Sequence, residues 1–274
     1  MLRDWQALQQ ALALEPAVLV SVARVQGSGP REVGAWMAVT ASRRIATIGG
    51  GQLEFEAIAQ AREILAAGPG CMAEPLRRYP LGPSLGQCCG GVVQLRYEWL
   101  AAADIAGLRE RLAGEDALLP VALFGGGHVG HAIVELLGRL PARVLWVDSR
   151  DEIFPPALPD NVRAEHSDPV QVAVAGLEPG ARVLIMSFSH AEDLDIVAAC
   201  LMRQRQRGDL PSVGLIGSRS KWASFRQRLQ ARGFSAAELA HITCPIGVPG
   251  IRGKQPAVIA VAAVAQLLQD LSGA

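Results

Sequence analysis

The stretch Val121-Ala122-Leu123-Phe124-Gly125-Gly126-Gly127-His128-Val129-Gly130 decides the fold of the second half of the chain. An apolar run leads into a turn of the form G-x-G-x-x-G, and an apolar helical stretch follows, which is typical of a phosphate-binding βα unit. Gly125 permits the tight turn, Gly127 lets the backbone approach a phosphate, and Gly130 lets helix and strand pack closely. Backbone N–H groups at the helix start would then face the anion.

A second apolar run, Val144 to Val147, ends in Asp148, 18 residues after Gly130. This spacing is near that at which an acidic residue meets a ribose hydroxyl in a dinucleotide-binding fold, and Arg150 could neutralise a phosphate beside it. His128 places a bulky ring where a plain dinucleotide site usually keeps small or apolar residues. That ring argues against ordinary NAD binding.

Composition bounds the class of protein. The 274 residues include 26 Lys plus Arg and 26 Asp plus Glu, and half are hydrophobic, so disorder and a general nucleic-acid or membrane-binding charge are not expected. The N-terminus lacks a signal-peptide core, and the apolar run from Pro256 to Ala265 is too short to span a bilayer. The five cysteines show neither paired C-x-x-C motifs nor a zinc-ligand spacing, so we expect a cytoplasmic protein with reduced thiols.

The periodicity predicts an α/β protein with two domains: a mixed α+β domain over residues 1–112, a linker over 113–118 and a doubly wound parallel sheet over 119–274. In the first domain we expect an opening helix, strands over 17–25, 35–40, 45–48 and 91–98, and a helix over 53–66. In the second we expect strands over 120–124, 143–147, 162–165, 181–187 and 212–216, helices starting near 129, 169, 192 and 219, and a closing helix over about 255–271.

Three loops of the first domain carry residues that could bind a ligand or react. Gly86-Gln87-Cys88-Cys89-Gly90-Gly91 places two thiols between glycines, where a ligand can approach closely and a thiolate can meet a soft metal or carry sulfur. The loop with Ser28 and Arg31 and the loop with Gly50, Gly51 and Glu54 together predict an anion or pterin cradle. The alternatives are plain turns, with Glu54 favouring a helix start and the cysteines packing. For Cys71, Cys200 and Cys244 packing is the interpretation we prefer.

In the second domain, His190 follows a buried strand and should lie at the ligand-binding edge, where it could move a proton. The alternative is a solvated loop histidine, with Asp193 serving the start of a helix. Two basic loops, 217–221 and 250–254, are either anion sites or surface charge.

Taken together, these elements resemble the XdhC/CoxI family of molybdenum-enzyme accessory proteins, most closely its xanthine dehydrogenase accessory branch. The matching elements run in order over nearly the whole chain, and those with Cys88-Cys89-Gly90-Gly91 and Cys244-Pro245-Ile246-Gly247 are the most specific. The others are Gly27-Ser28-x-Pro30-Arg31-x-x-Gly34-Ala35, Gly49-Gly50-Gly51-x-Leu53-Glu54, Phe124 to Gly130, Val147-Asp148-x-Arg150, Ser189-His190-x-x-Asp193 and Gly214-x-Ile216-Gly217-Ser218.

The resemblance implies an α+β module followed by a Rossmann-like module, in a cytoplasmic chaperone rather than an enzyme. It implies that the protein binds molybdenum cofactor (molybdopterin) as cargo, supports its sulfuration by a cysteine desulfurase and inserts it into apo-xanthine dehydrogenase. Cys88 and Cys89 become the candidates for contact with molybdenum or its sulfur. A homodimer is a reasonable expectation, and a nucleotide at the Rossmann-like module stays open.

Two other functions are compatible with the residues. An NAD(P)-dependent oxidoreductase would use Gly125 to Gly130 for pyrophosphate, Asp148 for ribose and His190 as the proton carrier. A nucleotide-sensing binding module would leave the cysteine pair structural.

Overall fold

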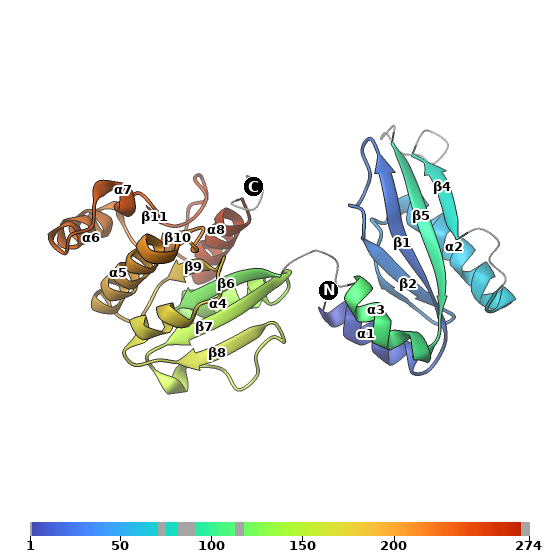
Figure 1. Ribbon diagram of the computed structural model, residues 1–274, viewed down its shortest axis with the longest axis horizontal. Coiled ribbons are helices and arrows are strands. Elements are labelled where there is room, and N and C mark those ends of the chain that lie inside the picture. The colour runs from blue at the N-terminus through green and yellow to red at the C-terminus, as the bar shows by residue number, and fades with distance from the viewer. Residues whose placement is uncertain (1, 71–74, 82–90, 113–117, 270–274) are drawn as a thin grey trace. The chain divides into compact units, whose positions relative to one another are not determined.

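The structure, a computed structural model, describes residues 2–70, 75–81, 91–112 and 118–269. The chain divides into two compact units, Met1–Ala117 and Leu118–Ala274 (Figure 1). Most of the predicted linker, residues 113–117, lies outside the described residues.

The first unit is a five-stranded antiparallel sheet with helices on both faces, as expected of a mixed α+β domain. The strand order is β3-β2-β1-β5-β4. Its elements are α1 (Leu2–Leu12), β1 (Ala17–Gln26), β2 (Trp36–Thr40), β3 (Arg44–Ala46), α2 (Gly51–Ala67), β4 (Leu76–Pro80), β5 (Val92–Leu100), the 3-10 helix η2 (Ala102–Asp104) and α3 (Ile105–Leu112).

The central strand β1 is buried on both sides because its side chains alternate between two helical layers. Val18, Val20 and Val22 belong to the core beneath α2. Ala17 and Leu19 face the opposite core, to which α1 and α3 contribute. The same alternation in β5 buries Val93, Leu95 and Tyr97, which confirms the pattern predicted for 91–98.

Strand β4 was not predicted from the sequence. Its segment Leu-Arg-Arg-Tyr-Pro carries two charges and is almost wholly exposed, so it shows no apolar alternation. It forms the edge of the sheet beside β5, where Pro80 is tolerated, and the hydroxyl groups of Tyr79 and Tyr97 lie 2.6 Å apart.

The second unit is a parallel sheet of six strands in the order β11-β10-β9-β6-β7-β8. With β6 counted as strand 1 and the sheet read from β8 to β11, this is the order 3-2-1-4-5-6 of a dinucleotide-binding fold. It confirms the predicted doubly wound sheet. Its elements are β6 (Leu119–Phe124), α4 (His128–Leu137), β7 (Ala142–Asp148), η3 (Asp151–Ile153), β8 (Val162–His166), η4 (Val170–Gly176), β9 (Arg182–Ile185), α5 (His190–Arg207), β10 (Val213–Leu215), α6 (Arg219–Ala231), α7 (Ala236–Leu239), β11 (Ile242–Thr243) and α8 (Pro256–Gln269).

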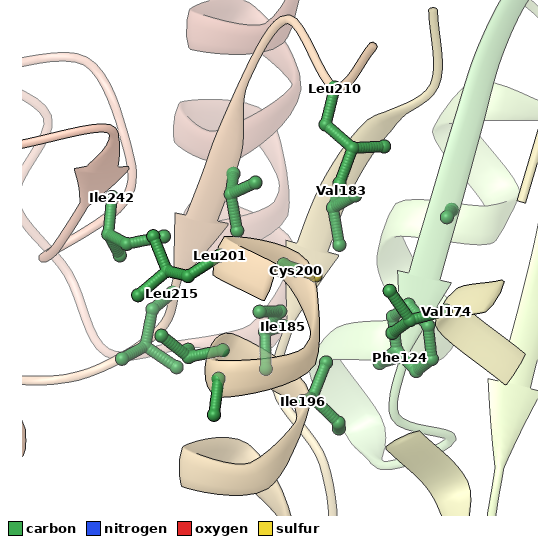
Figure 2. Packing of buried hydrophobic residues seen from close by; sticks show 14 of the residues in the cluster. Phe124, Val174, Val183, Ile185, Ile196, Cys200, Leu201, Leu210, Leu215 and Ile242 are labelled. Atoms are coloured by element: carbon green, nitrogen blue, oxygen red, sulfur yellow. The ribbon is translucent and has the colours of Figure 1, made fainter. Parts of the chain in front are cut away.

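Helices cover both faces of this sheet. Val121 and Leu123 of β6 pack with α4 and α8, whereas Ala122 and Phe124 point into the core formed with η4, α5 and α6. Figure 2 shows this second core, in which Ile185 and Cys200 lie among the aliphatic side chains of strands and helix. In the described part of the chain, no helix is both long and apolar enough to cross a bilayer.

One predicted helix of the second unit takes a different form. The segment expected to start an α-helix near 169 is instead the 3-10 helix η4, Val170–Gly176. Three of its seven residues are valines, whose side-chain rotamers an α-helix restricts, and Gly176 lowers the helix propensity further. The buried residues Val170, Ala173 and Val174 still anchor the segment in the core.

Candidate functional site

The glycine turn of the second unit lies between β6 and α4, at the carboxyl edge of the sheet. A Cβ at Gly125, whose φ is +125°, would lie 2.0 Å from the carbonyl oxygen of Met186, and a Cβ at Gly130 would lie 2.1 Å from that of Gly125. A Cβ at Gly127 would meet no atom within 4 Å. Two glycines are therefore required by packing, and the middle one leaves open space in front of the helix start, as the motif predicts.

Gly127 is the N-cap residue of α4, and as a glycine it has no side chain to accept hydrogen bonds from the helix start. The first N–H groups of the helix lack intrahelical partners, so they and the helix dipole favour an anion there. His128 is the first residue of α4 and is exposed. Its side chain is therefore solvent-accessible at the start of the helix that follows the turn.

Asp148, predicted to meet a ribose, is engaged by the chain itself. Its Oδ1 accepts from the backbone N–H and Nε of Arg150, at 2.9 and 2.8 Å. Its Oδ2 accepts from Gly126 N at 2.5 Å and Arg150 Nη2 at 3.0 Å. A carboxylate accepts about four hydrogen bonds, so Asp148 has no capacity left for a ribose hydroxyl in this conformation.

The surroundings of Asp148 fix its charge. Burial alone would raise the pKa of this carboxyl, but the hydrogen bonds from Arg150 and Gly126 and the Arg150 charge hold the pKa below its ordinary value. The aspartate therefore stays ionised and ties Gly126 to the loop after β7.

The loop after β9 brings further residues to the same edge of the sheet. Ser189 caps α5 by accepting from Glu192 N at 3.2 Å, and His190 is the first residue of that helix. His190 is exposed and lies edge-on to Phe225, 6.4 Å between ring centroids. This agrees with the expected edge position and leaves its proposed proton transfer as a prediction.

Lys221 does not extend into solvent, as an anion-binding lysine of the 217–221 loop would. Its Nζ donates to Asp193 Oδ2 at 2.5 Å and to the carbonyl oxygen of Ile216 at 2.9 Å. Asp193 in turn accepts from Ser187 N and Ser187 Oγ at 2.9 and 2.7 Å. The lysine thus pairs a buried carboxylate and links the loops after β9 and β10.

The two described cysteines, both in the second unit, are neutral thiols. Cys200 lies in the core, and burial raises the pKa of its thiol to about 12, which confirms the packing role expected of it. Cys244 is half-buried beside the Lys221–Asp193 pair, and burial raises the pKa of its thiol to about 11.

In the first unit, the two loops predicted to form a cradle lie against each other, and Gly91 lies beside them. A Cβ at Gly49 would lie 2.6 Å from Pro30 Cβ, which brings the Ser28–Arg31 loop against the glycine turn before α2. A Cβ at Gly91 would lie 2.0 Å from the carbonyl oxygen of Ser28. Gly91 is the last residue of the predicted thiol loop and its only described one, and it lies beside the loop that carries Ser28.

The two residues that flank segment 82–90 lie together. Leu81 N donates to the carbonyl oxygen of Gly91 at 2.7 Å, so the residues on either side of segment 82–90 are hydrogen-bonded to each other. Cys88, Cys89 and Gly90 lie outside the described residues, as does Cys71. Among the residues that the structure describes, no group of three or more His, Cys, Asp or Glu side chains could hold a metal ion.

Glu54 holds the glycine turn before α2 in shape through hydrogen bonds. Its Oε2 accepts from Ile48 N at 3.0 Å, Gly50 N at 3.1 Å and the Thr47 hydroxyl, and its Oε1 accepts from Arg44. Burial would raise the pKa of Glu54, but these partners outweigh it and hold the pKa below the ordinary value. The carboxylate is only 3% exposed, so Gly51, not Glu54, is presented to a ligand.

Ser28 and Arg31 lie at the rim of the same site. Ser28 is exposed, and the Arg31 guanidinium binds Glu32 at 2.8 Å while Nη1 donates to the carbonyl oxygen of Thr47 at 3.4 Å. Both members of the Arg31–Glu32 pair are solvent-accessible, so exchanging Glu32 for an anionic ligand costs little.

The two glycine turns share one construction that the sequence did not reveal. In each, an ionised carboxylate accepts a glycine N–H and pairs with an arginine: Glu54 with Gly50 and Arg44, and Asp148 with Gly126 and Arg150. The arginine neutralises the carboxylate, so an anion at the turn is not repelled by an unpaired negative charge. One residue at this edge of the sheet that the sequence motifs did not single out is Phe188, an exposed aromatic residue between two serines after the buried strand β9.

Family comparison fits this architecture. Residues 121–267 match the XdhC Rossmann domain, and residues 11–80 match the XdhC and CoxI family. The chain belongs to the XdhC and CoxI family. The resemblance read from the cysteine and glycine motifs is thereby confirmed.

One protein of similar sequence and one solved structure of similar fold complete the comparison. An uncharacterized protein of Escherichia coli strain K12, YqeB, is 22% identical over 255 residues, which cover 93% of this chain but only 43% of YqeB. A crystal structure of a xanthine dehydrogenase from Bacillus halodurans superposes with a TM-score of 0.75 over 98% of this chain and 96% of that chain. At 18% identity, the second likeness concerns the fold.

Proposed function

We propose that the protein is a carrier for molybdenum cofactor that protects the cofactor, supports its sulfuration by a cysteine desulfurase and inserts it into apo-xanthine dehydrogenase in the cytoplasm. Membership of the XdhC and CoxI family supports an XdhC-type role. The cargo, the sulfur donor, the receiving enzyme and a homodimeric state are parts of the proposal.

The observation that carries the proposal is the position of the residues that flank segment 82–90 in the first unit. Gly49 lies against Pro30, Gly91 lies against the Ser28 carbonyl group, and Leu81 N bonds to the Gly91 carbonyl oxygen, so the two ends of the segment that carries Cys88 and Cys89 lie beside the arginine loop and the glycine turn. A molybdenum cofactor has a soft metal-dithiolene centre, a flat hydrogen-bonding pterin and a terminal phosphate. Thiols, backbone amides and a guanidinium are the groups that suit these three parts.

In this proposal Cys88 and Cys89 meet the metal or its sulfur, and Ser28, Arg31, Gly50, Gly51 and Gly90 line the cradle. Glu54 holds the turn in shape through its bonds to Ile48 and Gly50. The glycine turn of the second unit, Gly125 to Gly130, is a phosphate site of that unit alone, where Asp148 supports Gly126. Contacts of this kind are reversible, which a carrier needs in order to release its cargo.

The insertion step is tested by transfer. The chain is loaded anaerobically with sulfurated molybdenum cofactor, freed of small molecules and mixed with apo-xanthine dehydrogenase, and xanthine oxidation is followed. We expect activation that exceeds that from the same amount of free cofactor, and its loss in a Cys88→Ala/Cys89→Ala variant but not in Cys71→Ala. Activation no better than that from free cofactor contradicts insertion by this protein.

A second candidate, an NAD(P)-dependent oxidoreductase, is favoured by one observation: the parallel strand order with an open Gly127 at the carboxyl edge. The saturation of Asp148 by four donors opposes it, because the expected ribose acceptor is occupied. Titration with NAD and NADP, followed by absorbance at the nicotinamide band with candidate substrates, separates the two functions.

A further inference from the structure

An exposed aromatic ring stands beside the glycine turn of the second unit. Phe188 is 66% exposed and follows β9, while Arg150 follows β7, and these two strands flank β6 in the sheet. The loops that carry both residues therefore lie on either side of the turn from Gly125 to Gly130. In dinucleotide-binding folds, ligands bind in this crevice beyond the carboxyl ends of the strands.

The ring is braced rather than loose. The Arg150 guanidinium carbon lies 4.5 Å from the Phe188 ring centroid, a cation–π contact, and the same guanidinium is fixed by two bonds to Asp148. Glu192 joins the two loops, because it accepts from Phe188 N at 3.1 Å and from the Ser149 hydroxyl at 2.7 Å. These contacts hold both the Phe188 backbone and its ring in place.

We propose that Phe188, braced by Arg150, is the stacking platform for the base of a nucleotide whose phosphates lie at the glycine turn. The guanidinium lies over the ring, and the 66% exposure of Phe188 leaves ring surface for a flat heteroaromatic base. Stacking of this kind tolerates different bases because every base has a π-face. The phosphates and the base fix such a nucleotide without a ribose bond to Asp148, whose acceptor sites are filled by Gly126 and Arg150. The inference rests on the proposed function only in assigning a phosphate to the glycine turn.

The test compares two ligands that differ in the base and sugar. Binding of ADP and of pyrophosphate to the full chain is measured by calorimetry for the natural protein, Phe188→Leu and Phe188→Trp. We expect ADP to bind more tightly than pyrophosphate, Phe188→Leu to weaken ADP binding about tenfold while leaving pyrophosphate unchanged, and Phe188→Trp to retain ADP binding. Val172→Ala, at a residue of η4 that is 61% exposed, is the matched control and should change neither.

Several results would overturn the platform. These are ADP that binds no more tightly than pyrophosphate, an equal loss of both ligands in Phe188→Leu, and failure of the folded chain to bind ADP. Biopterin tests the other source of a flat ring, and Phe188-dependent biopterin binding without an ADP preference also overturns the nucleotide assignment. Molybdenum cofactor retention is measured on the natural protein in parallel, so a natural protein that retains the cofactor but does not bind ADP rejects the platform alone and leaves the carrier function standing.

Discussion

Replacement of Glu54 by alanine should loosen the glycine turn before α2. The carboxylate is the acceptor for Ile48 N and Gly50 N, and its loss leaves these backbone donors without a partner on the protein side. Each unsatisfied buried polar group costs about 1–3 kcal/mol, so for these two donors we expect the first unit to lose about 2–6 kcal/mol of unfolding free energy. The ion pair with Arg44 adds little to this, because the arginine side chain is 51% exposed.

The assay is urea unfolding of the full chain, together with hydrogen exchange that reports residues 47–54 separately from the second unit. Glu63→Ala is the matched control, since Glu63 is an exposed glutamate on the same helix and should change stability by less than about 0.5 kcal/mol. Glu54→Gln keeps an acceptor oxygen and should fall between the control and the alanine variant.

The sign of the pH dependence follows from the lowered pKa of Glu54. A carboxyl whose folded pKa lies below its unfolded value stabilises the protein above the unfolded pKa, and this contribution disappears as the pH falls through the folded pKa. The stability difference between the natural protein and Glu54→Gln should therefore shrink as the pH falls from neutrality to below the ordinary glutamate value. An alanine variant as stable as the natural protein, or a difference that does not depend on pH, would refute this reasoning.

Two further perturbations test the second unit. Gly130→Ala should destabilise it, because the new Cβ would lie 2.1 Å from the Gly125 carbonyl oxygen. Gly127→Ala should keep the melting temperature, because its Cβ meets nothing within 4 Å, but should weaken pyrophosphate binding, because the methyl group occupies the space through which the phosphate approaches the backbone. Equal melting temperatures for the two variants would contradict these steric roles. Lys221→Met leaves the buried Asp193 carboxylate without its cation and should cost about 3–5 kcal/mol in urea unfolding, and a loss below about 1 kcal/mol would mean that the pair is not needed.

Much of the fold follows from local pattern. The apolar run before Gly125 and the alternation of Val93, Leu95 and Tyr97 each predict a strand that the structure contains. Strand β4 escaped prediction because a short charged edge strand is held by its neighbour β5 and not by a pattern of its own. The 3-10 form of η4 escaped prediction because the apolar run suggested a helix without showing how strongly its three valines and Gly176 disfavour the α form.

The candidate site was less predictable for a physical reason. An acidic residue beside a glycine turn can bind a ligand or support the turn, and the spacing of Asp148 from Gly130 is the same in both cases. The decision depends on partners: Arg150 fills the acceptor sites of Asp148, and Arg44 and Thr47 do the same for Glu54. Phe188 could be recognised as a platform only once Arg150 and Glu192 were seen to brace it.

Cofactor retention tests the central claim most directly. The purified chain is mixed anaerobically with free molybdenum cofactor, unbound small molecules are removed, and molybdenum and pterin are measured per polypeptide. The carrier function predicts near-stoichiometric retention of both, lost in Cys88→Ala/Cys89→Ala with the fold intact and kept in Cys71→Ala. A well-folded natural protein that retains neither molybdenum nor pterin would contradict it.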